Sequence, residues 1–181
     1  MTHDLTEHCL DSNILHQGHF LTLRRDTVQL PDGNTSHREY VRHPGAVAVL
    51  ALLDNGNLLF ERQYRYPAGR EFLEIPAGKI DPGEDILLTA QRELLEETGY
   101  TASDWTFLMS SWACIGYSDE QIHYFLARGL RHEGRQLDEG EFLEVFELPM
   151  ETALDWVRQG KINDSKSSLG LFWLQDYLQR L

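Results

Sequence analysis

The chain has few cysteines, few basic residues and no long apolar run, and each shortage excludes a class of protein. Its two cysteines, Cys9 and Cys114, are too few among 181 residues for a disulfide framework, and neither stands in a CxxC metal pattern. Lysine and arginine total 16 against 29 aspartates and glutamates, which gives a net charge of −13. A chain this acidic is a poor general binder of nucleic acid or of anionic membranes.

The sequence also has no recognisable targeting or membrane-spanning segment. No stretch approaches the ~20 apolar residues of a membrane helix, and the N-terminus carries acidic residues without the apolar run of a signal peptide. None of the eight histidines belongs to an HExxH or a Cys/His ligand spacing. We therefore expect a cytoplasmic protein with unpaired thiols and no membrane or nucleic-acid partner.

What the chain does have is the composition of a globular protein with an α+β pattern. It is 41% hydrophobic and 25% charged, and a chain this long buries roughly 70% of its unfolded surface. Strand patterns dominate, and two helices are predicted near the end, one starting at Pro149 and one capped by Asp164 or Ser165. The run 46–53 is apolar throughout, as in a strand buried on both faces. The other predicted strands lie in 58–65, 71–75, 105–113, 121–130 and 141–148.

The first 43 residues are more polar than the rest and read as a β-hairpin over about 20–43. Two organisations are compatible with this pattern. Residues 1–43 could be the first strands of one large sheet, or a small N-terminal extension that packs on the main domain or on a second subunit. We predict the second arrangement, with domains at 1–43 and 44–181.

Three glutamates, Glu93, Glu96 and Glu97, stand together near the end of a predicted helix, which Gly99 ends. Each residue of an α-helix advances by about 100°, so Glu97 lies about 40° and Glu96 about −60° from Glu93. Like charges at this spacing cost roughly 0.2–0.5 kcal/mol, and the helix dipole disfavours negative charge at this end. The cluster is either a solvated acidic face or a binding site for hard divalent cations, which prefer oxygen ligands.

The surrounding residues favour the cation site. Gly78 stands six positions before Glu84, and seven intervening residues lead to the run RELLEETGY at 92–100. This spacing resembles the signature of the Nudix hydrolase family: Gly, five residues, Glu, seven residues, then Arg-Glu-aliphatic-x-Glu-Glu-x-Gly-aliphatic. Only Tyr100 departs from it. The resemblance implies a mixed β-sheet sandwiched between helices, and Mg²⁺- or Mn²⁺-dependent hydrolysis of a nucleoside diphosphate linked to another group.

The resemblance also implies metal ligands. Glu93 and Glu97 look like the main ligands. Glu96 looks like a further ligand or a partner through water, and the main-chain carbonyl of Ala77 looks like another ligand. Such a cation neutralises the phosphates and lowers the pKa of bound water, which suits cleavage of a diphosphate.

Further roles follow from the same resemblance. Glu84 and Arg92 look like residues that orient the metal-binding glutamates, and Gly78 permits close approach of the backbone. In the branch that the chain resembles, the base comes from a loop after the sheet strands. Glu139 is our candidate base and Glu141 a candidate extra metal contact, although the loop LDEGEFLEV also reads as a solvated acidic turn.

Nearly the whole chain resembles the ADP-ribose pyrophosphatase branch of the family, in HPGAVAVLAL, ERQYRYPAGREFLEIPAGKID and GKINDSKSSLGLFWL. That branch cleaves ADP-ribose to AMP and ribose 5-phosphate and forms dimers through its N-terminal strands. Arg65 matches a substrate-contacting position, although it also reads as a surface arginine in a salt bridge. Arg38 and Arg70 are weaker candidates.

One position departs from the branch. Ile115 stands where a proline is usual, sixteen residues after the last glycine of the signature, and Tyr117 follows it. Another nucleoside diphosphate sugar, such as GDP-mannose, or a dinucleotide is therefore an alternative substrate. A domain that senses nucleotides without cleaving them is a further alternative. It is disfavoured because the acidic chain has no spare ~70 residues for the DNA-binding domain of such regulators.

Overall fold

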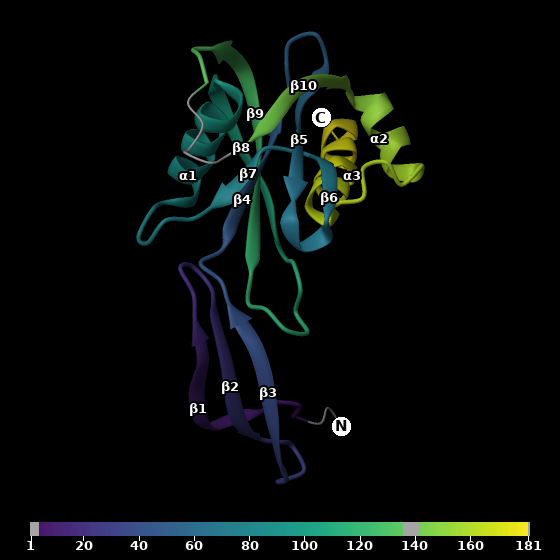
Figure 1. Cartoon of the computed structure of the whole chain (residues 1–181). Coiled ribbons are helices and arrows are strands. Elements are labelled where there is room, and N and C mark those ends of the chain that lie inside the picture. The colour runs from purple at the N-terminus through teal and green to yellow at the C-terminus, as the bar shows by residue number, and fades with distance from the viewer. Residues whose placement is uncertain (1–3, 136–141, 181) are drawn as a thin grey trace. The chain divides into compact units, whose positions relative to one another are not determined.

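The computed structural model describes residues 4–135 and 142–180, and the chain divides into two compact units (Figure 1). The first comprises Met1–Gly45 with Trp112–Glu120, and the second Ala46–Ser111 with Gln121–Leu181.

The first unit contains a three-stranded antiparallel sheet in the order β1-β2-β3. Its strands are β1 (His8–Gln17), β2 (Thr22–Gln29) and β3 (Thr35–Arg42). The predicted hairpin is β2–β3, turned at Gly33, whose φ of 86° suits glycine. Strand β1 was not predicted, because every one of its residues is exposed and the sequence shows no apolar alternation there.

The second unit holds two sheets, one ordered β10-β5-β6 and one β7-β4-β9-β8. Strand β4 pairs antiparallel with β7 and parallel with β9, so the sheet is mixed, as predicted. The strands are β4 (Ala46–Ala51), β5 (Asn57–Arg65), β6 (Arg70–Glu74), β7 (Ala77–Lys79), β8 (Tyr100–Trp112), β9 (Gln121–His132) and β10 (Leu143–Pro149), with a 3₁₀ turn at Tyr66–Ala68.

Helices α1 (Ile86–Glu93) and α3 (Ser165–Gln179) both pack against β4 and β9. Side chains alternate along a strand: Val47 and Val49 share one cluster with Ala90 and Leu94 from the α1 segment. On α3, Gly170 faces Tyr124 of β9. The sheet therefore lies between two helices (Figure 1), which explains why β4 is apolar throughout.

The helix ends follow ordinary capping chemistry. Asp85 caps α1 by accepting from the N–H of Leu87, and Asp164 caps α3 by accepting from the N–H of Ser167. Helix α2 (Met150–Arg158) follows Pro149, as predicted. Within residues 4–135 and 142–180, every helix is too short or too polar to cross a membrane.

Helix α1 does not stay regular to its end. Residues Leu94–Thr98 form a π-helical turn, which Gly99 ends with a φ of 78°. The 100° advance assumed from the sequence therefore holds only as far as Glu93, since a π turn is wider. Sequence patterns do not distinguish such a turn from a regular helix, and turns of this kind are frequent at functional sites.

Candidate active site

Strand β7 and helix α1 bring Gly78 directly against Glu93. A Cβ atom built on Gly78 would lie 1.8 Å from Cδ of Glu93, so this position has room for glycine only. Beside it, the main-chain N–H of Ala77 donates a 3.0 Å hydrogen bond to Oε2 of Glu97. Two carboxylates therefore border the stretch Ala77–Gly78.

Arg92 binds three of the nearby carboxylates. Its Nε and Nη2 donate to the two oxygens of Glu84 over 3.1 and 3.0 Å, and its Nη1 donates to Glu93 and Glu96, each over 2.9 Å. The hydroxyl of Thr89 adds a 2.8 Å hydrogen bond to Glu84. These contacts, chiefly the one from Arg92, lower the pKa of Glu84 to about 2. The hydrogen bond to Glu84 in turn raises the pKa of Arg92.

The three clustered glutamates differ in their access to water. The side chain of Glu96 is 31% exposed and that of Glu93 is 13% exposed, whereas Glu97 is 3% exposed. A buried carboxylate is costly unless it is paired or hydrogen-bonded. The solvated acidic face considered from the sequence is therefore wrong for Glu97.

These donors suit a hard cation, although they are not gathered around one. In the described part of the chain, no group of three or more His, Cys, Asp or Glu side chains is arranged to hold a metal ion. Glu93 and Glu96 contact Arg92, and Glu97 contacts the N–H of Ala77. Carboxylates are nevertheless the ligands that Mg²⁺ takes, and Gly78 leaves the space next to the Glu93 carboxylate free of a side chain of its own. The chemistry of the donor set therefore fits Mg²⁺ or Mn²⁺.

A second ionic network joins β5 and β6 to the start of α3. Nε and Nη2 of Arg65 each donate to Glu74 over 2.8 Å. Lys166 contacts Glu74 and also donates to Asp164 over 2.9 Å. Burial raises the pKa of Glu74, but the hydrogen bond from Arg65 and the charge of Lys166 outweigh it, so the pKa lies below its ordinary value.

The three arginines proposed as substrate contacts lie in different surroundings. The hydrogen bond to Glu74 is the main cause that raises the pKa of Arg65, and the charge of Glu97 contributes. The two networks therefore lie near each other. Arg70 donates to Asn163 over 2.7 Å. Arg38 belongs to the first unit, where its Nε donates to Glu7 over 2.9 Å.

Two family models cover most of the chain. Residues 42–167 match the NUDIX domain, and residues 7–41 match the nucleoside diphosphate sugar hydrolase N-terminal domain. The chain belongs to the Nudix family. The predicted family and the prediction of a hydrolase are thereby confirmed.

Curated relatives of this Nudix chain are similar along almost their whole length. The ADP-ribose pyrophosphatase of Bacillus subtilis is 43% identical over 173 residues, covering 94% of each protein. The methanol dehydrogenase activator of Bacillus methanolicus is 41% identical over 171 residues, covering 93% of this chain and 92% of that protein. A solved ADP compounds hydrolase, 24% identical, superposes with a TM-score of 0.87 over 98% of this chain and 97% of its own, which confirms the fold.

Four residues of these two networks have no role predicted from the sequence. Glu74, Lys166 and Ser167 belong to the second network, and Thr89 supports Glu84. The segment GKINDSKSSLGLFWL, which contains Lys166 and Ser167, resembles the family without indicating a role for either residue. Its polar residues stand at the start of a predicted helix, and a charged residue that is buried there needs a partner. This pattern is the sequence signal that could have indicated the second network.

Two predicted residues, Glu139 and Glu141, lie outside the described residues. The departure at Ile115 lies in a loop of the first unit, where its side chain is 83% exposed. In the same loop, Asp119 accepts from the N–H of His43 over 2.8 Å and forms a 2.9 Å ion pair with Arg42. This loop is thus tied to the end of β3.

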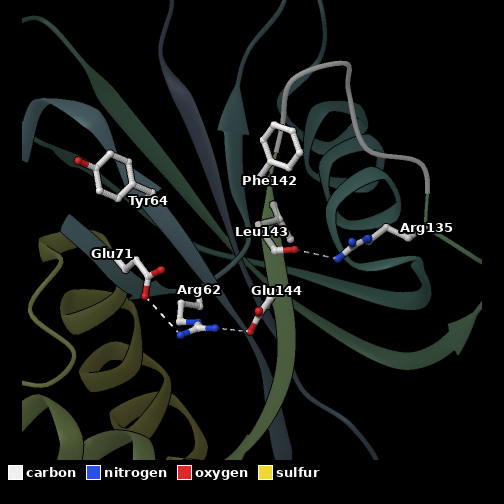
Figure 2. A pocket seen from close by; sticks show the side chains of 7 residues that line it. All are labelled: Arg62, Tyr64, Glu71, Arg135, Phe142, Leu143 and Glu144. Carbon is white, nitrogen blue, oxygen red and sulfur yellow. Dashed lines mark hydrogen bonds and ion pairs between the residues drawn. The ribbon is translucent and has the colours of Figure 1, made fainter. Parts of the chain in front are cut away.

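A hollow of about 370 Å³ opens on the other face of β5 (Figure 2). Alternate residues of a strand face opposite sides, so Arg62 points away from Glu61 and Arg65. Arg62 forms ion pairs with Glu71 over 3.3 Å and with Glu144 over 2.7 Å. None of the predicted site residues within 4–135 and 142–180 lines this hollow. Its lining consists of Arg62, Tyr64, Glu71, Arg135, Phe142, Leu143 and Glu144.

Proposed function

We propose that this Nudix hydrolase cleaves the diphosphate bond of ADP-ribose to give AMP and ribose 5-phosphate, with Mg²⁺ or Mn²⁺ as cofactor. The observation that carries the proposal is the placement of two carboxylates, Glu93 and Glu97, against Ala77–Gly78. The similarity to the B. subtilis ADP-ribose pyrophosphatase along nearly the whole chain supports the substrate.

In this proposal, Glu93, Glu97 and the carbonyl of Ala77 hold the cation, and Glu96 and Glu141 provide further contacts. The cation supplies charge neutralisation at the diphosphate and an acidified water. Glu93 accepts a hydrogen bond from Arg92 in the structure, and its carboxylate would be one of the groups that hold the cation.

Other residues orient the site and handle the proton and the substrate. Arg92 is held by both oxygens of Glu84, so its position would not depend on its contact with Glu93. Glu139 accepts the proton of the attacking water as general base. Arg65, whose side chain is 43% exposed beside a buried Glu74, binds a substrate phosphate. Arg38 and Arg70 are weaker candidates for such contacts.

The test is hydrolysis of ADP-ribose by the purified chain with Mg²⁺, followed by chromatography of AMP and ribose 5-phosphate. Glu97→Gln keeps an oxygen that can accept from the N–H of Ala77 but removes the charge of a proposed ligand. We expect kcat to fall by at least about 100-fold, the upper end of the effect seen for residues that only orient metal ligands. Glu151→Gln is the matched control, because Glu151 is exposed on α2. The absence of turnover of any nucleoside diphosphate derivative with metal present would refute the proposal.

A second candidate substrate is another nucleoside diphosphate sugar, such as GDP-mannose, or a dinucleotide. The observation that favours it is Ile115, which stands exposed where the ADP-ribose branch usually has proline. Rates measured side by side on ADP-ribose, GDP-mannose and a dinucleoside polyphosphate decide between them. If GDP-mannose or the dinucleoside polyphosphate has a higher kcat/KM than ADP-ribose, that compound is the preferred substrate.

We also propose a homodimer formed through the N-terminal strands of residues 1–43, in the cytoplasm. Cys9 and Cys114 are free thiols, which is typical of a reducing compartment. The B. methanolicus relative is named an activator of another enzyme. Regulation of a partner protein is therefore an alternative activity for this chain. Tight binding of ADP-ribose without product formation would favour it.

A further inference from the structure

We propose that the N-terminal cap of α3, through Ser167 and Asp164, positions the backbone that carries the Ala77 metal ligand. Ser167 is thus a positioning residue of the Nudix site, although it stands 68 residues beyond Gly99, the last glycine of the signature. The inference rests on the proposed function, since it concerns the cation of that site.

The connection begins at a buried main-chain group. The N–H of Ile75 donates a 2.9 Å hydrogen bond to Oγ of Ser167, and Ser167 is 0% exposed. The hydroxyl of Ser167 donates in turn to Oδ2 of Asp164 over 2.7 Å, and this carboxylate also accepts from the N–H of Ser167 over 3.0 Å. The cap of α3 therefore fixes the hydroxyl that receives Ile75.

From Ile75 onward, each residue is held by a different element. The carbonyl of Pro76 accepts from the N–H of Val49 over 2.8 Å. The N–H of Ala77 donates to Glu97 over 3.0 Å, and Gly78 is packed against Glu93. The carbonyl of Ala77 lies only two residues from Ile75, about 7 Å along an extended chain, so a shift at Ile75 is passed to the ligand.

Helix α3 is also closely packed against Ile75 and Tyr124 at Gly170. A Cβ atom on Gly170 would lie 3.3 Å from Cδ1 of Ile75 and 3.3 Å from Cδ1 of Tyr124, so the helix backbone packs directly on these side chains. The network of Lys166 and Arg65 on Glu74 holds the residue just before Ile75. Residues at the start of α3 therefore bind both the side chain of Glu74 and the main chain of Ile75.

The experiment compares Ser167→Ala with Ser165→Ala, a matched change at an exposed position in the same helix turn. The dissociation constant of Mn²⁺ is measured by electron paramagnetic resonance on the full chain without substrate, together with Tm and the Mg²⁺ dependence of kcat. We expect Ser167→Ala to weaken Mn²⁺ binding about 10-fold, as for other residues that orient metal ligands. Ser165→Ala should bind Mn²⁺ as the unaltered chain does.

A purely structural role would lower the Tm of Ser167→Ala and leave its Mn²⁺ affinity unchanged, and this result would overturn the inference. If Ser167→Ala does not fold, Asp164→Ala takes its place, because Asp164 is partly exposed and fixes the same hydroxyl. Weaker Mn²⁺ binding by folded Asp164→Ala would support the inference, and unaltered affinity would overturn it. Mn²⁺ binding by the unaltered chain without any hydrolysis would overturn the proposed function alone.

Discussion

At the scale of single residues, the acidic site is stabilised by contacts that the sequence spacing only partly shows. Like charges close together on a helix are unfavourable. Arg92 offsets the repulsion among Glu84, Glu93 and Glu96 by donating a hydrogen bond to each of them. The spacing of the signature predicts these residues. It could not show that Glu97 is buried, because burial depends on strands that lie elsewhere in the chain.

Glycine at position 78 is expected to be essential. Alanine would place Cβ 1.8 Å from Cδ of Glu93 and displace that carboxylate or strand β7. We expect Gly78→Ala to lower kcat/KM for ADP-ribose by about 100-fold, the effect of a misplacement of about 1 Å. Gly116→Ala is the control, since no heavy atom lies within 4 Å of its added Cβ. Equal activity of the two variants would show that Glu93 is not needed in its present position.

Glu84 makes the free energy of unfolding depend on pH. Its pKa is about 2 in the folded chain and 4.5 in the reference state, so between these values the unfolded chain binds more protons. The stabilisation is therefore complete above about pH 5 and is lost as the pH falls toward 2. Urea unfolding should show the difference between the unaltered chain and Glu84→Gln shrinking from pH 5 to pH 2.5. A constant difference would contradict the depressed pKa.

At the scale of elements, most helices and strands could be predicted but their partners could not. The apolar run of β4 and a cap of α3 at Asp164 or Ser165 could be predicted, because burial on both faces and capping leave local patterns, and the structure has Asp164 as the cap. Strand β8 begins at Tyr100, one residue after the π turn, rather than near 105. The contact of α3 with Glu74 joins residues far apart in sequence, and no local pattern encodes it.

That contact should contribute to stability. Lys166 pairs with the buried Glu74, so Lys166→Met leaves this carboxylate with Arg65 alone. We expect the free energy of unfolding at pH 7 to fall by about 1–3 kcal/mol, the cost of a lost buried hydrogen bond. Lys161→Met is the control, because its exposed ammonium lies 5.3 Å from the ring of Trp156, a contact of under about 1 kcal/mol. Urea denaturation measures both, and an equal loss in the two variants would contradict the assignment.

At the scale of the whole molecule, the polarity of the first 43 residues predicts a domain boundary near residue 43. The described part of the first unit buries a single large apolar side chain, Val28, in its sheet. Leu10, Ile14 and Leu15 of β1 are 56, 57 and 49% exposed. A sheet this small needs an apolar face covered by another layer to be stable, and a second copy of the chain would supply it.

The mass of the protein in solution tests this arrangement. We expect light scattering to give twice 20.9 kDa for the unaltered chain. Ile14→Glu places a charge among the exposed apolar residues of β1, so its mass should fall to that of one chain at micromolar concentration. Asn13→Glu adds the same group at the neighbouring exposed position and should remain dimeric. A monomeric unaltered chain, or a dimer that persists in Ile14→Glu, would refute an interface formed by this part of β1.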